Sequence, residues 1–293
     1  MPLTRFKVIH GRFVITGYEP DGDSMRFIAN DITQYDDLHR AYKIMPSKRD
    51  GSVQLRFEGI DAPETHYGSA AQPLGDVARD ALLKLVGFNH VDYGGTGNKV
   101  ISASPAEVAG CILTKGAEIH GRPIAYILIG GDHRTDGSVI NVDNKLLKQT
   151  LNYQLVEQGH VYSLLYSSTP LPHRKLFRTA AKTARNASLG VWSVDETSSF
   201  VLDNQASIDP HGALIFPKLF RRCTDFLKTA GGQAEPGFDL GDWLAANPMQ
   251  DDQLYIEAAM GKPIQMHLSG LIEQRNHRVT VQGDILDVVF IEK

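Results

Sequence analysis

The sequence predicts a mixed α+β fold: a small five-stranded Greek-key barrel, about three helices packed around it, and a small C-terminal α+β module. Some short runs alternate apolar and polar residues, as half-buried strands do. Longer runs repeat apolar residues every three or four positions, as amphipathic helices do. The order along the chain is strands, helix, strands, helix, helix. A barrel with helices around it is the economical way to bury these apolar faces.

The strand pattern recurs in five segments, residues 6–18, 24–28, 53–60, 108–113 and 123–129. The turn Asp21-Gly22-Asp23 separates the first two, and Pro63 ends the third because proline cannot donate to a sheet ladder. The polar stretch 30–51 is either an elongated hairpin connection or an inserted helical turn. Together these segments supply the five strands of the barrel.

Helical spacing of apolar residues occurs in three further segments. Residues 72–86 end at Gly87, residues 145–158 at Gly159, and residues 173–187 just before Gly190. A glycine just beyond the last periodic residue is a typical helix stop. These are the helices that we expect to cover the barrel.

The domain prediction is a barrel domain at 1–192, a polar linker at 193–209 and an accessory α+β module at 210–293. In the module, apolar residues from Phe216 to Leu227 have helical spacing, and 264–273 with 278–291 resemble a hairpin joined through 274–277. The module carries no catalytic constellation. Regulation, self-association, binding of a protein partner and simple bracing all stay open for it.

Charge is distributed unevenly although the chain has a net charge of −4. Residues 1–192 hold 22 Lys and Arg against 19 Asp and Glu, whereas residues 193–293 hold 8 against 15. A basic run from His173 to Arg185 is either a solvated helix face or an attraction for phosphate backbones. The acidity of the C-terminal part disfavours an independent role in DNA binding.

Other functional classes have little support in the sequence. The 11 histidines show no zinc-ligand spacing, and the two cysteines, Cys111 and Cys223, suit the core better than a disulfide framework. The N-terminal residues lack the apolar stretch of a secretory signal, and no apolar run is long enough to cross a bilayer. We expect a cytoplasmic protein without a membrane role, or one secreted from a processed precursor.

Four charged islands carry the most informative chemistry: Asp21-Gly22-Asp23, Arg56, Asp61-Ala62-Pro63-Glu64 and Gly121-Arg122. Carboxylate oxygens suit a hard cation such as Ca²⁺, and planar guanidinium groups match a phosphate whose charge grows during reaction. Arg56 precedes Asp61 by an odd number of residues, so regular strand alternation places their side chains on opposite faces. We expect a bulge or bend at Gly59 that corrects this.

The islands occur within a longer pattern that resembles the staphylococcal nuclease family over about residues 6–192. The pattern also includes Leu151 to Gly159 and the segment Ala187-Ser188-Leu189-Gly190-Val191-Trp192. The resemblance implies an oligonucleotide-binding barrel that carries a Ca²⁺-dependent phosphodiesterase. Such an enzyme cuts DNA and RNA with little sugar specificity and leaves 3′-phosphate ends.

The resemblance also implies a role for each island. Asp23 and Asp61 become metal ligands together with the backbone carbonyl of Ala62. Asp21 either shapes the coordination shell of the metal by hydrogen bonding or only forms the turn. Glu64 activates the attacking water, and Arg56 and Arg122 bind the scissile phosphate, with Arg122 also stabilising the leaving oxygen. For each arginine the alternative is a surface salt bridge, and for Glu64 it is a surface position beside a proline turn.

Two departures from the family pattern concern the nucleotide. Ile119-His120 stands where the best-known member has a Lys-Tyr pair before the second arginine, so one phosphate contact is weakened or replaced. The expected aromatic pair after Gly159 corresponds to Tyr162 and Tyr166, which are four residues apart instead of two. Each is either a stacking platform for a base or a core residue.

The leading functional hypothesis is an active, metal-dependent nuclease acting on DNA, RNA or both, with Ca²⁺ or another divalent cation. A second hypothesis is a catalytically quiet barrel that binds nucleic acid or a protein partner. A third is an active nuclease whose acidic C-terminal part screens the substrate and holds activity down. Electrostatic screening of this kind fades as the salt concentration rises.

Overall fold

The computed structural model of the 293-residue chain describes residues 5–95, 97–130, 134–233, 237–257 and 264–292. Internal contacts divide the chain into two compact units. Unit 1 comprises Met1–Ile60, Asp76–Leu155 and Pro170–Leu176, and unit 2 comprises Asp61–Gly75, Val156–Thr169 and Phe177–Lys293. Each unit is therefore assembled from several separate stretches of the chain.

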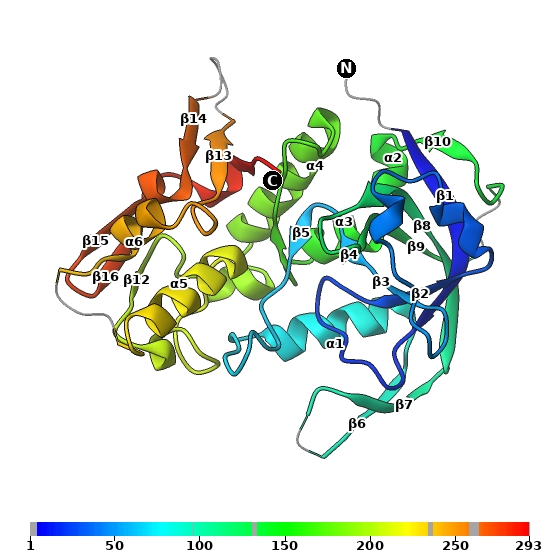
Figure 1. The fold of residues 1–293 in the computed structure, drawn as a ribbon, viewed down its shortest axis with the longest axis horizontal. Coiled ribbons are helices and arrows are strands. Elements are labelled where there is room, and N and C mark those ends of the chain that lie inside the picture. Colours follow the sequence, from blue (N-terminus) through cyan, green and yellow to red (C-terminus); the bar gives the residue numbers. More distant parts are fainter. Residues whose placement is uncertain (1–4, 96, 131–133, 234–236, 258–263, 293) are drawn as a thin grey trace. The chain divides into compact units, whose positions relative to one another are not determined.

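Unit 1 is organised by one large sheet with the strand order β3-β2-β1-β8-β9-β4, to which β10 adds at β1. Its strands are β1 (Arg5–Val14), β2 (Arg26–Ala29), β3 (Val53–Gln54), β4 (Arg56–Phe57), β8 (Glu107–Ala117), β9 (Pro123–Ile129) and β10 (Val139–Asn141). In Figure 1, β1, β8 and β9 run alongside one another, in agreement with their antiparallel pairing. All five predicted strand segments are present.

The sheet curls into a nearly closed barrel because its two end strands are neighbours in the sequence. Only Leu55 separates β3 from β4, yet β3 pairs with β2 and β4 pairs in parallel with β9. The Leu55 amide donates to the Met25 carbonyl at 2.9 Å, which continues the contact with the β2 side. The predicted barrel is thus confirmed, and residues 53–57 bridge its two edges.

Apolar side chains of the strands fill the barrel. On β1, Phe6, Val8 and Phe13 are buried, and the middle of β8 is buried throughout. Tyr126 of β9 is also fully buried, and its ring lies 5.1 Å from that of Phe6. This packing supplies the apolar burial that stabilises the sheet.

Several elements of unit 1 are absent from the sequence prediction. β6 (His90–Tyr93) and β7 (Val100–Ser104) form a separate hairpin, and β10 is a short added strand. The polar stretch 30–51 joins the antiparallel strands β2 and β3 and contains two short 3-10 helices, Ile32–Tyr35 and Ala41–Lys43, so both alternatives are observed: a long hairpin connection with inserted helical turns. Short elements of this kind leave too few residues for a periodic signal.

The predicted helices form, with one interruption. α1 (Gly75–Val86) and α4 (Leu171–Asn186) match their predicted segments, but the segment 145–158 divides into α2 (Asn144–Leu147) and α3 (Leu151–Glu157). Thr150 lies at the break, where its hydroxyl donates to the Leu147 carbonyl at 2.7 Å and accepts from the Tyr153 amide at 3.3 Å. A threonine that bonds to the local backbone in this way competes with the helix.

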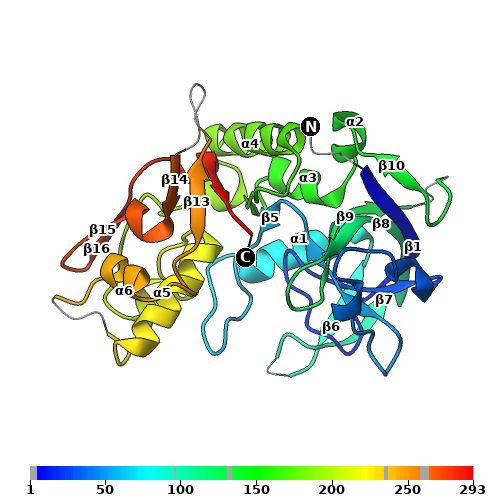
Figure 2. The ribbon, with the colours of Figure 1, turned by 45° about the horizontal axis from the view of Figure 1, so that its top comes forward.

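Unit 2 combines helices with two small antiparallel sheets. Its helices include α5 (Pro217–Thr229) and α6 (Leu240–Ala246), which lie side by side in Figure 2 and contact each other, and the part of α4 from Phe177 on. The sheets have the orders β12-β16-β15 and β14-β13-β17. Their strands are β12 (Ser199–Val201), β13 (Gln253–Ile256), β14 (Ile264–His267), β15 (Ile272–Arg275), β16 (Arg278–Val281) and β17 (Val288–Phe290), and β11 (Tyr162–Ser163) also belongs to unit 2.

The predicted C-terminal hairpin is shorter than expected. β15 and β16 form its turn-proximal part, but 3-10 helices at Leu268–Leu271 and Ile285–Asp287 interrupt both runs. Beyond these interruptions, β14 and β17 instead pair with β13. The Asp284 carboxylate caps the second interruption by accepting from the Leu286 amide at 3.0 Å, a local bond that ends the strand.

Residues 193–209, which the sequence predicts to be a linker, contain β12 and a 3-10 helix at Gln205–Ser207. β12 pairs with β16, so this stretch contributes to a sheet. The boundaries of the barrel domain and the accessory module stay a prediction. Among the residues that the structure describes, no helix has the length and apolar character needed to cross a membrane.

Candidate functional site

The residues predicted to be functional are distributed over both units. Asp23, Arg56 and Arg122 belong to unit 1, whereas Asp61 and Glu64 belong to unit 2. Ala62, Tyr162 and Tyr166 are also in unit 2. The convergence of all of them on one phosphate stays a prediction, and each unit has its own local geometry.

In unit 1 the backbone brings the Asp21-Gly22-Asp23 turn next to β4. The Asp23 carbonyl accepts from the amide of Phe57 at 3.0 Å, one residue after Arg56. The Asp21 carboxylate accepts from the Asp23 amide at 3.1 Å, which is the bond of an Asx-turn. Asp21 therefore helps to form the turn, and its role in shaping a metal shell stays a prediction.

Arg56 and Arg122 lie on neighbouring strand ends. Arg56 is in register with Ile124 of β9, and Arg122 lies two residues before Ile124. Parallel pairing of β4 with β9 thus carries both arginines toward the same end of the strand pair. This is the arrangement that two guanidinium contacts on one phosphate require, although the contact itself stays a prediction.

The expected bend after Arg56 is present. Gly59 has φ +81°, a conformation that favours glycine, and it separates β4 from β5 (Ile60–Asp61). Asn152 of α3, fully buried, donates to the carbonyls of Glu58 at 2.9 Å and Ala125 at 3.0 Å. Its side-chain oxygen accepts from the Ile127 amide at 2.9 Å. Asn152 therefore fastens the start of the bend to β9, a positioning role that sequence reasoning missed.

Arg122 has an internal counter-ion from its own turn. Its Nε donates to Oε1 of Glu118 at 3.2 Å, and its backbone amide donates to the same oxygen at 3.1 Å. Burial raises the pKa of the Glu118 carboxyl, but the hydrogen bonds from His120 and Arg122 and the Arg122 charge outweigh it and lower the pKa overall. The turn is fixed by Gly121, where a Cβ atom would lie 2.0 Å from the Lys43 carbonyl oxygen.

In unit 2, one guanidinium group engages both predicted acidic residues. Nη2 of Arg221 donates to Oδ1 of Asp61 at 3.1 Å and to Oδ2 at 3.0 Å, and Nη1 donates to Oε1 of Glu64. The Asp61 side chain is fully buried, and the Arg221 and Glu64 side chains are 20% and 17% exposed. Arg221 lies on α5, about 160 residues along the chain, and no feature of the sequence indicates this pairing.

The stretch from Asp61 to Gly75 is held firmly within unit 2. The Gln72 side chain accepts from the Glu64 amide at 3.2 Å and donates to the Ile215 carbonyl at 2.7 Å. The Tyr67 hydroxyl donates to Asp225 of α5 at 2.9 Å. Gly75 permits close packing, because a Cβ atom there would lie 2.5 Å from the Glu64 carbonyl oxygen. The backbone of Glu64 is therefore fixed against the region that carries Arg221.

The donor chemistry of Asp61 fits a hard cation such as Ca²⁺, since carboxylate oxygens are its usual ligands. As arranged, however, these oxygens receive a guanidinium group, which would repel a second cation beside it. In this arrangement Arg221 therefore disfavours a divalent cation at Asp61. Within the described part of the chain, no group of three or more His, Cys, Asp or Glu side chains is placed to hold a metal. Ala62 is buried, and its role as a carbonyl ligand stays a prediction.

The two tyrosines differ in environment. Tyr162 is fully buried, its ring lies 5.0 Å from that of Trp192, and its hydroxyl donates to Asp195 at 2.8 Å. Of the two roles left open for Tyr162, core packing is the one observed. Tyr166 is partly exposed and contacts the Phe290 ring at 6.2 Å, so a stacking role for it stays a prediction.

The basic run on α4 is paired with acidic residues of unit 2. Arg178 contacts Glu257 at 2.8 Å, Lys182 contacts Asp287 at 2.8 Å, and Arg185 makes two bonds to Asp284 at 2.8 and 2.7 Å. The sequence offered a solvated face or phosphate attraction for these side chains. Instead, much of their charge is neutralised by the C-terminal part of the chain.

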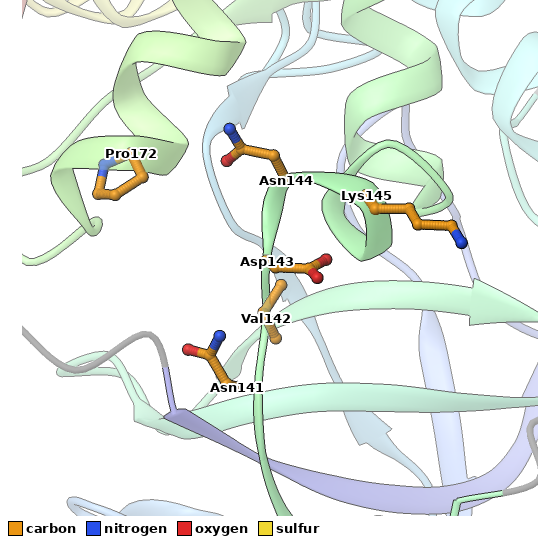
Figure 3. Close-up of a pocket in the computed structure, with 6 residues that line it drawn as sticks. All are labelled: Asn141, Val142, Asp143, Asn144, Lys145 and Pro172. Atoms are coloured by element: carbon orange, nitrogen blue, oxygen red, sulfur yellow. The ribbon is translucent and has the colours of Figure 1, made fainter.

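A hollow of about 430 Å³ in unit 1 lies apart from the predicted residues. Figure 3 shows its lining from Asn141 to Lys145 and at Pro172. The Asp143 carboxylate accepts from the Leu146 amide at 2.8 Å and so caps α2. None of the predicted catalytic or metal-binding residues lines this hollow.

The fold and the charged islands agree with a comparison against protein families. Residues 54–194 match the model of the family described as staphylococcal nuclease homologue. The chain carries a staphylococcal nuclease-like domain. The resemblance is confirmed over this segment, which includes Arg56, Asp61, Glu64 and Arg122, whereas Asp21 and Asp23 lie outside it. A search of curated proteins found no match. The match suggests nuclease-type activity for the staphylococcal nuclease-like domain.

Proposed function

We propose that this protein is a Ca²⁺-dependent phosphodiesterase that hydrolyses DNA and RNA and leaves 3′-phosphate ends. The observation that carries the proposal is the presence of Arg56, Asp61, Glu64 and Arg122 together in the segment that matches the nuclease family. The parallel register of β4 and β9 supports it, because this register carries both arginines to one end of the strand pair.

In the proposed mechanism each residue has one task. Glu64 accepts a proton from the attacking water, and Arg56 binds the non-bridging oxygens of the scissile phosphate. Arg122 neutralises charge on the phosphate and on the leaving 5′-oxygen. Asp23 and Asp61 would hold Ca²⁺ once Arg221 has released Asp61, and the bound ion would supply Lewis-acid stabilisation of the phosphoryl oxygens.

The experiment is a digestion assay on plasmid DNA and on RNA with Ca²⁺ or with EDTA. Wild type is compared with Arg56→Ala/Glu64→Ala and with Arg12→Gln as a control, because Arg12 belongs to an exposed pair with Glu107. We expect Ca²⁺-dependent cleavage that only the double variant loses. Product ends should accept polymerase extension only after phosphatase treatment. Equal cleavage by the wild type and the double variant would show that another site is responsible.

A second candidate is a catalytically quiet module that binds nucleic acid or a protein partner. The pairing of Arg221 with Asp61 and Glu64 favours it, since this contact leaves the acidic residues engaged internally. Self-association or partner binding through residues 210–293 belongs to the same proposal. It predicts that labelled oligonucleotides bind in a fluorescence anisotropy assay while neither wild type nor Arg221→Gln cleaves them.

A further inference from the structure

Arg221 contacts two carboxylates, Asp61 and Glu64, which we call the acidic pair, through several directional hydrogen bonds. A guanidinium group presents its N–H donors in a rigid fork, and here one fork reaches two carboxylates that are three residues apart. Three hydrogen bonds between charged partners are stronger and more directional than a single surface pair. The acidic pair thus has its own internal cation.

Because Asp61 is buried, the positive charge of Arg221 is important for it. The Asp61 side chain is fully buried, and an isolated ionised carboxylate in such a place carries a large desolvation penalty. Arg221 supplies the compensating charge. A divalent cation at the same oxygens would supply it too, but repulsion between like charges disfavours occupation of the pair by both together.

The backbone that carries Arg221 is anchored. Phe220, Cys223 and Phe226 bury the inner face of α5, and Pro217 occupies its first turn. The next residue, Arg222, is also tied down, since its Nη2 donates to Asp252 at 2.6 Å and its Nη1 donates to Gln250 at 2.7 Å. Release of the acidic pair therefore requires rotation of the long Arg221 side chain, with α5 staying in place.

We propose that Arg221 is a built-in competitor for the metal: it binds Asp61 and Glu64 in the metal-free protein, and a divalent cation binds Asp61 only by displacing it. This inference rests on the proposed function, because it concerns the cation of the same site. It makes Arg221 a residue that sets the metal affinity. In this proposal the C-terminal part acts on the metal through a basic residue, whereas electrostatic screening would act on the substrate through acidic residues.

The direct test is calorimetric titration of the full-length, metal-free protein with CaCl₂. Arg221→Gln removes the charge and retains a polar side chain, and Arg221→Lys retains the charge but loses the fork. The matched control is Lys228→Gln, because Lys228 is another cation of α5 that contacts the same stretch, with its Nζ 5.0 Å from the centre of the Tyr67 ring.

We expect Ca²⁺ affinity to rise at least about tenfold in Arg221→Gln, to rise less in Arg221→Lys, and to stay unchanged in Lys228→Gln. The tenfold figure corresponds to one lost competing interaction of ordinary strength. Unchanged or weaker affinity in a folded Arg221→Gln would overturn the proposal, as would the absence of Ca²⁺ binding in all variants.

A double variant guards against loss of folding. Asp61→Asn/Arg221→Gln removes the buried charge together with its partner, so we expect a folded protein that has lost the tighter Ca²⁺ binding. If this variant binds Ca²⁺ as tightly as Arg221→Gln, the ion binds elsewhere and the proposal fails. Calorimetry separates this proposal from the proposed function. Tighter binding without cleavage would reject only the nuclease, and cleavage with unchanged affinity would reject only the competition.

Discussion

Unit 1 and unit 2 each hold part of the predicted catalytic set, and in each an internal counter-ion engages it. In unit 1, Arg122 pairs with Glu118, which is four residues away in the same turn, and the Arg122 side chain is 35% exposed. In unit 2, Asp61 and Glu64 pair with Arg221, about 160 residues away, and Asp61 is fully buried. The partly exposed Arg122 side chain can exchange Glu118 for water or a substrate phosphate, whereas the fully buried Asp61 carboxylate resists the loss of its partner. We therefore expect the Arg221 contact in unit 2, more than the Glu118 contact in unit 1, to control the activity of the predicted catalytic set.

The largest expected effect is on catalysis through the acidic pair. Glu64→Gln should lower the cleavage rate by about 10²- to 10⁴-fold, because an amide cannot accept the proton of the attacking water. The measurement is the initial rate of DNA digestion with Ca²⁺, beside Arg12→Gln. Retention of most activity in Glu64→Gln would remove this residue from the mechanism and make its contact with Arg221 purely structural.

The next effect is on stability. Arg221→Ala should lower the free energy of unfolding by about 3–5 kcal/mol, because it leaves the buried Asp61 carboxylate without its partner. Glu118→Ala leaves the partly exposed Arg122 side chain without this partner and should lower the free energy of unfolding by less, about 1 kcal/mol. Urea denaturation of both variants measures the difference. Equal costs would contradict the contrast between the fully buried Asp61 and the partly exposed Arg122.

A smaller effect is expected on substrate binding in unit 1. Glu118→Gln removes the charge that neutralises Arg122, so Arg122 should bind the substrate phosphate more tightly. We expect a few-fold lower KM with little change in kcat, in line with about 1 kcal/mol for a partly exposed ion pair. Steady-state kinetics on a short oligonucleotide decides this. A raised KM would mean that Glu118 instead holds Arg122 in its productive position.

The smallest effects concern pH, and a buried histidine and a paired aspartate should respond in different windows. Burial lowers the pKa of His173 in unit 1, whose Nε2 lies 2.8 Å from the Val142 carbonyl oxygen. The unfolded chain then binds a proton more readily than the folded one, so this contribution to stability is lost as the pH falls below about 6.5.

In unit 2, the hydrogen bonds from Arg185 lower the pKa of Asp284. This contribution to stability is present above the ordinary value for an aspartate, about 3.9, and is lost as the pH falls from there through the lower folded pKa. Unfolding free energies measured against pH should show both windows. His173→Gln should flatten the upper one and leave the lower one, and a variant that keeps both slopes would contradict the assignment.

Local patterns were sufficient for the elements of the barrel. Alternating burial on β1 and helical spacing on α1 follow from the sequence, and so does the bend at Gly59. The break at Thr150 and the added strand β10 escaped prediction, because a side-chain hydrogen bond and a three-residue pairing leave no periodic signal. The same holds for the candidate site. Short motifs in the sequence predicted its residues, but the sequence did not predict which residues those side chains pair with.

The sequence by itself determined the barrel segments, the family resemblance and the inventory of Arg56, Asp61, Glu64 and Arg122. These depend on local periodicity and on short motifs, which the chain carries in contiguous residues. Only the tertiary structure decided that Tyr162 is buried, that Arg185 pairs with Asp284 and that Arg221 engages the acidic pair. Packing and ion pairing of this kind depend on proximity between residues distant in the chain, and the strength of each contact depends on burial.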